Sequence, residues 1–138
     1  MIWDLLMIDI LIRVHNESEW LPFLIESIEN QKDISVNKIL VLDNRSKDDC
    51  ESILKHYPDS RIIYKRYDHD YKPGEMLNYG IDILLKTNSE SNYVIIVSAH
   101  CYFLNNFSLK NIYSNLNKNK KARSAFGRQV PMNISDPQ

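Results

Sequence analysis

Residues 8–17 read IDILIRVHNE, an isoleucine-rich run followed at once by a polar turn, and this stretch decides the fold. Its first seven residues have the β-branched character of a strand. Three further short runs resemble it, at residues 38–42 (KILVL), 61–64 (RIIY) and 93–97 (YVIIV). Two of the four runs are almost wholly apolar, which is typical of parallel strands covered on both faces.

The segments between these runs carry apolar residues at helical spacing. The four stripes are Leu21, Leu24, Ile25 and Ile28; Cys50, Ile53, Leu54 and Tyr57; Leu77, Ile81 and Leu84; and Leu109, Ile112, Tyr113 and Leu116. Ser46 with Asp49 three residues later predicts a capped start for the second helix. Pro22 is acceptable only in an early turn, so the first helix should begin near it. The alternation predicts an α/β, Rossmann-like fold, with a mostly parallel sheet in the order 3-2-1-4 and helices on both faces.

Sheets of this kind bind ligands beyond the carboxyl ends of their strands. The residues there are 13–17, 43–48, 67–74 and 98–102. Neither G-x-G-x-x-G nor G-x-x-x-x-G-K-[ST] occurs in a chain with only three glycines, which excludes the dinucleotide fingerprint and the P-loop. A nucleotide would therefore have to be bound by side chains.

The polar residues after the first strand have two interpretations. His15 could stack on a base, and Arg13 could meet a phosphate or a base edge. The alternative is that Asn16 and Glu17 simply cap the next helix.

The later strand ends leave similar alternatives open. Asp43 follows a buried strand, so its carboxylate can accept from a uracil N3–H or a ribose hydroxyl, unless it only belongs to a turn before the helix. His100 is a possible metal ligand or phosphate donor, although a lone histidine is more often structural. Asp68, His69 and Asp70 could be drawn as a metal cluster, but consecutive loop residues seldom converge on one ion.

Composition narrows the possible functions of this 138-residue chain. It is 43% apolar and 25% charged, with a net charge of −1, so we expect one globular domain and no basic nucleic-acid clamp. No run is long enough to predict a membrane span, and the acidic, apolar start is a poor signal peptide. Cys50 and Cys101 lack C-x-x-C spacing, which favours a reduced, cytoplasmic protein without a zinc site.

The order of five segments resembles a known family. They are residues 13–17 (RVHNE), 43–48 (DNRSKD), 74–80 with Gly74, Asn78 and Gly80, 98–100 (SAH) and 127–131 (GRQVP). Together they resemble the N-terminal, nucleotide-sugar-binding half of family 2 glycosyltransferases of the GT-A fold, over about residues 7–136. The last segment is similar to the G-R-Q-x-P segment of a rhamnosyltransferase-like branch.

The resemblance implies a set of nucleotide-binding residues and a metal position. The set is Arg13, His15, Glu17, Asp43, Asn78 and Ser98, and the metal position is His100. Within the set, Arg13 and His15 would touch the base, Asp43 would accept from the base or ribose, and Asn78 would lie near the diphosphate.

The chain departs from the family at the metal position. The family's D-x-D triplet, which holds Mg²⁺ or Mn²⁺ against the diphosphate, aligns with Ser98-Ala99-His100 and so lacks both carboxylates. Imidazole suits Mn²⁺ better than Mg²⁺ but adds no negative charge. We therefore expect only weak Mn²⁺ or Mg²⁺ binding, and only with a nucleotide diphosphate present.

The second departure concerns length. The family's general base lies well beyond the D-x-D position, whereas here 38 residues follow His100 and Asp136 comes too early to be the base. We expect residues 1–138 to be a single domain, the donor-binding part of a family 2 domain that is shortened at its C-terminus, with its catalytic residues unassigned.

Two functions from different classes follow. The first is a glycosyltransferase-like domain that binds a nucleotide-diphospho-sugar, for inverting transfer to an acceptor hydroxyl of a glycan or lipid-linked acceptor in polysaccharide or glycan synthesis. The alternative is a non-catalytic nucleotide-binding or assembly module. A phosphoacceptor receiver domain built on Asp43 is disfavoured, because such domains need an acidic pair after the first strand and only Glu17 is nearby.

Overall fold

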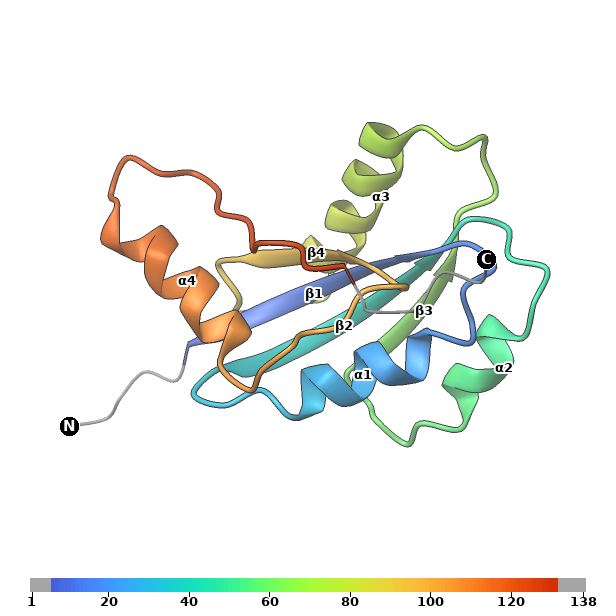
Figure 1. Cartoon of the computed structure of the whole chain (residues 1–138). Helices are drawn as coiled ribbons and strands as arrows, with labels where there is room; N and C mark the ends of the chain where they lie inside the picture. Colours follow the sequence, from blue (N-terminus) through green and yellow to red (C-terminus); the bar gives the residue numbers. More distant parts are fainter. Residues whose placement is uncertain (1–5, 132–138) are drawn as a thin grey trace.

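A computed structural model describes residues 6–131 of the chain, so Asp136 lies outside the described residues. Strands and helices alternate throughout (Figure 1). Their bounds are β1 (Met7–Val14), α1 (Leu21–Glu29), β2 (Ser35–Asp43), α2 (Cys50–Lys55), β3 (Ile62–Arg66), α3 (Pro73–Leu85), β4 (Val94–Ser98) and α4 (Ser108–Lys118). All pairings are parallel and the strand order is β3-β2-β1-β4, which confirms the predicted fold class and order.

Two apolar clusters hold helices to opposite faces of the sheet. The larger cluster joins alternate residues of β1 and β2, such as Ile10 and Ile39, to α1, α2 and Leu109 of α4. The smaller cluster joins Leu11 and Leu40 to α3. Because both faces are covered, β1 and the second half of β2 are buried almost completely, as their apolar sequences predicted.

The helix starts agree with the sequence in one case and not in the other. Pro22 lies in the first turn of α1, as predicted. Cys50 begins α2, but no side chain caps this helix at its N-terminus. The predicted cap on Ser46 is wrong, because the Ser46 hydroxyl instead accepts a hydrogen bond from the backbone N–H of Asn16, at 2.9 Å. A partner 30 residues away in sequence thus outcompetes the local cap.

The strand register collects the predicted site residues at one edge of the sheet. Arg13 lies beside Ser98 of β4, and Val14 lies beside Asp43 of β2. Within residues 6–131, no helix is long and apolar enough to cross a membrane.

Candidate functional site

Arg13 lies at the centre of the carboxyl edge, near the end of β1. Its Nη2 donates to Ser98 Oγ at 3.1 Å and its Nη1 donates to Tyr71 Oη at 3.3 Å. Its buried Nε has no partner, and no carboxylate of the described chain forms an ion pair with it. Because both hydroxyl partners are neutral, the guanidinium keeps its positive charge available to an anion.

Asp43 ends β2 and is only 1% exposed. Its Oδ1 accepts from the Ser46 backbone N–H at 2.8 Å, and its Oδ2 accepts from the Tyr64 hydroxyl at 2.6 Å. Burial, and secondly the hydrogen bond to Asp43, raise the pKa of Tyr64, so this hydroxyl remains a donor at neutral pH. A carboxylate oxygen can accept more than one hydrogen bond, so each oxygen keeps some capacity for a ligand.

The turn after β1 is fastened to the turn after β2. His15 Nδ1 lies 2.6 Å from the Asn44 carbonyl oxygen, and Asn16 Oδ1 accepts from the Lys47 backbone N–H at 2.7 Å. Asn16 has a positive φ of 53°, a conformation that asparagine tolerates better than most residues. The His15 side chain remains exposed at this edge, where a planar ligand could stack on it.

Glu17 and His100 connect the first turn to the segment after β4. Glu17 Oε1 and His100 Nδ1 are 2.5 Å apart, with 26% of the glutamate side chain and 57% of the histidine side chain exposed. His100 stands where the family has its D-x-D carboxylates, and the structure places the carboxylate of Glu17 beside it. Glu17 lies 83 positions earlier in the chain.

The loop between β3 and α3 closes the other side of this edge. The Asn44 side-chain amide donates to the carbonyls of Tyr67 and His69, at 3.1 and 3.0 Å. Arg66 pairs with Asp68, and Arg45 pairs with Asp70. These two carboxylates are thus engaged by arginines, and the described residues contain no group of three or more side chains able to hold a metal ion.

The structure brings together six of the seven predicted site residues but not the seventh. Arg13 contacts Ser98, Glu17 contacts His100, and His15 and Asp43 belong to the linked turns after β1 and β2. Asn78 lies exposed on α3 and forms no side-chain hydrogen bond to any of them.

Sequence reasoning missed two tyrosines. Tyr64 holds Asp43, and its place on the strand beside β2 was a usable signal, because β3 was already predicted next to β2. Tyr71 holds Arg13 from an irregular loop, 58 positions away. The sequence placed residues 67–74 at this edge but did not indicate which of them would contact Arg13.

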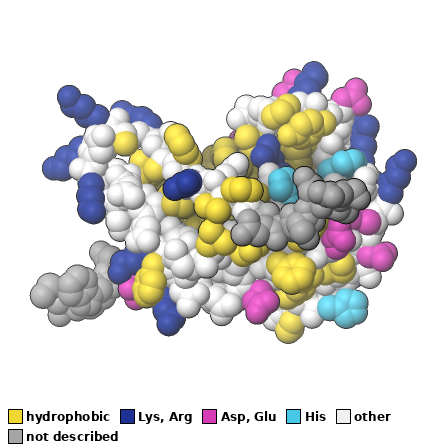
Figure 2. All heavy atoms as spheres, in the orientation of Figure 1, with side chains coloured by type: hydrophobic (Ala, Val, Ile, Leu, Met, Phe, Trp, Pro, Cys, Tyr) yellow, Lys and Arg dark blue, Asp and Glu magenta, His cyan; other side chains and the backbone are white. Residues whose placement is uncertain are grey.

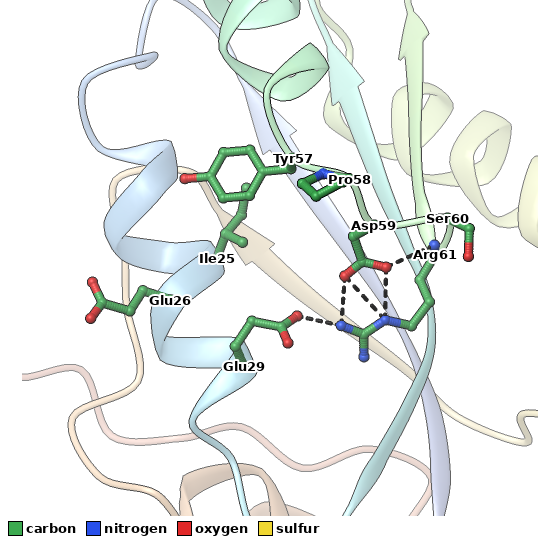
Figure 3. Close-up of a pocket in the computed structure, with 8 residues that line it drawn as sticks. All are labelled: Ile25, Glu26, Glu29, Tyr57, Pro58, Asp59, Ser60 and Arg61. Carbon is green, nitrogen blue, oxygen red and sulfur yellow. Dashed lines mark hydrogen bonds and ion pairs between the residues drawn. The ribbon is translucent and has the colours of Figure 1, made fainter.

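Two surface pockets have linings that include none of the seven predicted site residues. One, of about 570 Å³, is lined by α1 and the connection into β3 (Figure 3). Within it, Arg61 pairs with both Glu29 and Asp59. The other, of about 440 Å³, is lined by α1 and the segment after β4. Arg13, Asp43 and His100 line neither of these two pockets.

The fold and the edge define a class: a parallel α/β protein whose polar side chains gather where such sheets bind their ligands. Residues 9–132 match the model of glycosyl transferase family 2. The chain belongs to that family, as the order of its motifs predicted. The match does not resolve a branch within the family.

Solved structures show the same fold. S. aureus TarS, residues 1–349, superposes with a TM-score of 0.65 at 18% identity, over 91% of this chain and 38% of that chain. TarS in complex with UDP-GlcNAc superposes with a TM-score of 0.66 at 18% identity, over 91% of this chain and 37% of that chain. The mannosyltransferase PcManGT from Pyrobaculum calidifontis, in complex with GDP-Man and Mn²⁺, superposes with a TM-score of 0.62 at 16% identity. The superposition covers 77% of this chain and 31% of that chain.

The chain thus spans less than two-fifths of the length of these neighbours. No curated protein sequence matches it.

Proposed function

We propose that this chain is the donor-binding part of a family 2 glycosyltransferase and that it binds a nucleotide-diphospho-sugar at the carboxyl edge of the sheet. One observation carries the proposal. Arg13 is a cation at the centre of that edge, and its partners are neutral hydroxyls rather than carboxylates. A guanidinium so placed can donate two hydrogen bonds to an anionic ligand without first breaking an ion pair.

The other residues receive roles from where they lie. His15 stacks on the base, and Asp43 accepts from the base or the ribose through the capacity that Ser46 and Tyr64 leave free. Ser98 and Glu17 lie on either side of the sugar and diphosphate. Asn78, exposed on α3, is assigned to the diphosphate only on the family resemblance, since its side chain forms no hydrogen bond to the other residues of the set.

The metal position fits a weak site. Imidazole is a ligand that Mn²⁺ accepts, and His100 would supply it, with the Glu17 carboxylate beside the ring. One protein ligand is too few to hold the ion alone, so oxygens of the diphosphate would have to complete the coordination. When bound, the ion neutralises charge on the leaving nucleotide.

The full reaction that we propose is inverting transfer of the sugar to an acceptor hydroxyl. The acceptor is a glycan or a lipid-linked saccharide in polysaccharide synthesis, in the cytoplasm. The general base belongs to the acceptor-binding part of the parent enzyme. The segment at residues 127–131 supports the rhamnosyltransferase-like branch. Membership of an enzyme family disfavours the alternative of a non-catalytic module.

Titration calorimetry with UDP, GDP, dTDP and CDP tests donor binding. We expect one of these diphosphates to bind, and Arg13→Gln to weaken it by about tenfold or more, because a hydrogen bond to a charged group is lost. Lys86→Gln, which removes an exposed cation at the end of α3, is the matched control and should bind as the parent does. If no diphosphate binds the parent, or if Arg13→Gln binds as tightly as the parent, the proposal fails.

A further inference from the structure

The contact between Glu17 and His100 engages only one of the two imidazole nitrogens. Nδ1 lies 2.5 Å from the carboxylate, whereas Nε2 has no hydrogen-bond partner among the described residues. More than half of the His100 side chain is exposed. The second oxygen of Glu17 accepts from the His15 backbone N–H at 3.4 Å, so the first turn also holds the carboxylate.

Such a contact determines which nitrogen can bind a ligand. In a neutral imidazole one nitrogen carries the proton and the other carries the free lone pair. A carboxylate beside Nδ1 favours the proton there, and this leaves the lone pair on Nε2. Histidines that bind metal ions usually donate the other ring N–H to a carboxylate, a backbone carbonyl or a water, and this partner orients the ring and makes it a better ligand.

We infer that Glu17 is a positioning residue for His100. Glu17 holds the Nδ1 proton, and it thereby presents the Nε2 lone pair to the Mn²⁺ that accompanies the nucleotide diphosphate. This inference rests on the proposed donor binding. It gives the turn after β1 a part in the metal position at His100, through the contact of Glu17 with the ring. The acidic group thus acts mainly through the imidazole rather than as an added charge.

The tautomer of His100 gives a test that needs no ligand. Long-range proton–nitrogen NMR at about pH 8 should show His100 protonated on Nδ1 in the parent. In Glu17→Ala the proton should move toward Nε2, whereas Glu17→Gln should keep it on Nδ1, because an amide oxygen can still accept. Glu19→Ala, which removes an exposed acid two positions away, should leave the tautomer unchanged. A parent His100 that is protonated on Nε2 would overturn the inference.

Nucleotide binding gives the second readout. Calorimetry measures the affinity of each variant for UDP with and without Mn²⁺, and the ratio of the two affinities is compared between variants. If another nucleotide diphosphate binds the parent better than UDP, it replaces UDP in this experiment. We expect the ratio to fall about tenfold in Glu17→Ala, to stay close to the parent value in Glu17→Gln, and to be unchanged in Glu19→Ala. Denaturant unfolding of each variant verifies that it is folded.

The outcomes separate the two proposals. If the parent binds no diphosphate, donor binding fails and the inference falls with it. If the parent binds a diphosphate but ignores Mn²⁺, only the inference is overturned, and His100 is then a direct donor to phosphate or a structural residue. Equal loss in Glu17→Gln and Glu17→Ala would also overturn it, because the negative charge rather than the position of the ring would then be what matters.

Discussion

Asp9 shows how one buried acid can secure the end of the sheet opposite the candidate site. It lies in β1, is only 2% exposed, and forms no ion pair within residues 6–131. Its Oδ1 accepts from the Lys38 backbone N–H at 3.1 Å and from Ser91 Oγ at 3.0 Å, and its Oδ2 accepts from Ser89 Oγ at 2.6 Å. The carboxylate thus connects β1 to β2 and to the connection before β4.

We expect Asp9→Ala to lower the free energy of unfolding by about 2–3 kcal/mol, because several buried donors lose their acceptor. Asp9→Asn should cost less, since its amide oxygen can still accept some of these bonds. Urea unfolding at pH 7 measures both. An alanine variant within about 0.5 kcal/mol of the parent would show that water replaces the carboxylate without cost.

At the scale of an element, α3 depends on a glycine for its close approach to the sheet. A Cβ at Gly80 would lie 2.7 Å from Leu11 Cδ1 and 3.2 Å from Leu42 Cδ2, and both leucines are fully buried. A Cβ at Gly74, one and a half turns earlier, would meet nothing within 4 Å. The two glycines of one helix therefore form a natural comparison.

Gly80→Ala should destabilise the protein by about 1–2 kcal/mol, since overpacking outweighs the gain in helix propensity. Gly74→Ala should be neutral or stabilise by up to about 1 kcal/mol. Thermal or urea unfolding of the two variants decides this. The packing argument is wrong if both substitutions stabilise the protein.

The connection into β3 contains an ion pair that makes stability depend on pH. Arg61 donates four hydrogen bonds to Asp59, three from its guanidinium and one from its backbone N–H. The Asp59 side chain is 23% exposed, and these bonds lower its pKa below the ordinary value of 3.8. A lowered pKa stabilises the folded protein fully above pH 3.8, and this contribution disappears as the pH falls through the folded-state value.

We therefore expect Asp59→Asn to be less stable than the parent by about 0.5–1 kcal/mol at pH 7. The difference should shrink as the pH falls below 3.8. Urea unfolding of both proteins across this range measures it. A difference that is constant with pH would mean that Asp59 acts through packing or neutral hydrogen bonds.

At the scale of the whole molecule, the two edges of the sheet differ. On the inner side of β4, the Tyr93 carbonyl accepts from the Asp9 backbone N–H, and the Ala99 N–H donates to the Arg13 carbonyl. Because backbone groups alternate in direction along a strand, the N–H and C=O groups of Val94 and Ile96 face the outer edge of the sheet. No backbone hydrogen bond of the described chain reaches them there. Their side chains are 36% and 44% exposed, and β4 carries no charge, whereas β3 carries Lys65 and Arg66.

An uncharged, exposed edge strand is prone to pair with another chain. We expect the parent to associate as its concentration rises, and Ile96→Lys to remain monomeric over the same range. Sedimentation velocity measures this. Leu85→Lys, which alters an apolar residue of α3 that is 73% exposed, is the control and should associate as the parent does. Equal association of all three proteins would place the contact elsewhere. Figure 2, in the orientation of Figure 1, shows apolar side chains at the surface near the middle of the view.

Local patterns predicted most of the architecture. The four apolar runs became four parallel strands in the predicted order, and the stripe that begins at Leu21 became α1. The errors were also local. Helix α2 ends at Lys55, two residues before the last residue of its stripe, and Ser46 does not cap it. Turn residues have several competing partners of similar strength, so sequence alone could not choose among them.

The sequence by itself determined the alternation of strands and helices and hence the parallel sheet and the edge where the site lies, because periodicity depends on patterns that run along the chain. Only the tertiary structure decided which side chains meet at that edge. Glu17 reaches His100 across 83 positions and Tyr71 reaches Arg13 across 58. These contacts depend on the register of parallel strands and on the path of irregular loops, and neither leaves a periodic signal in the sequence.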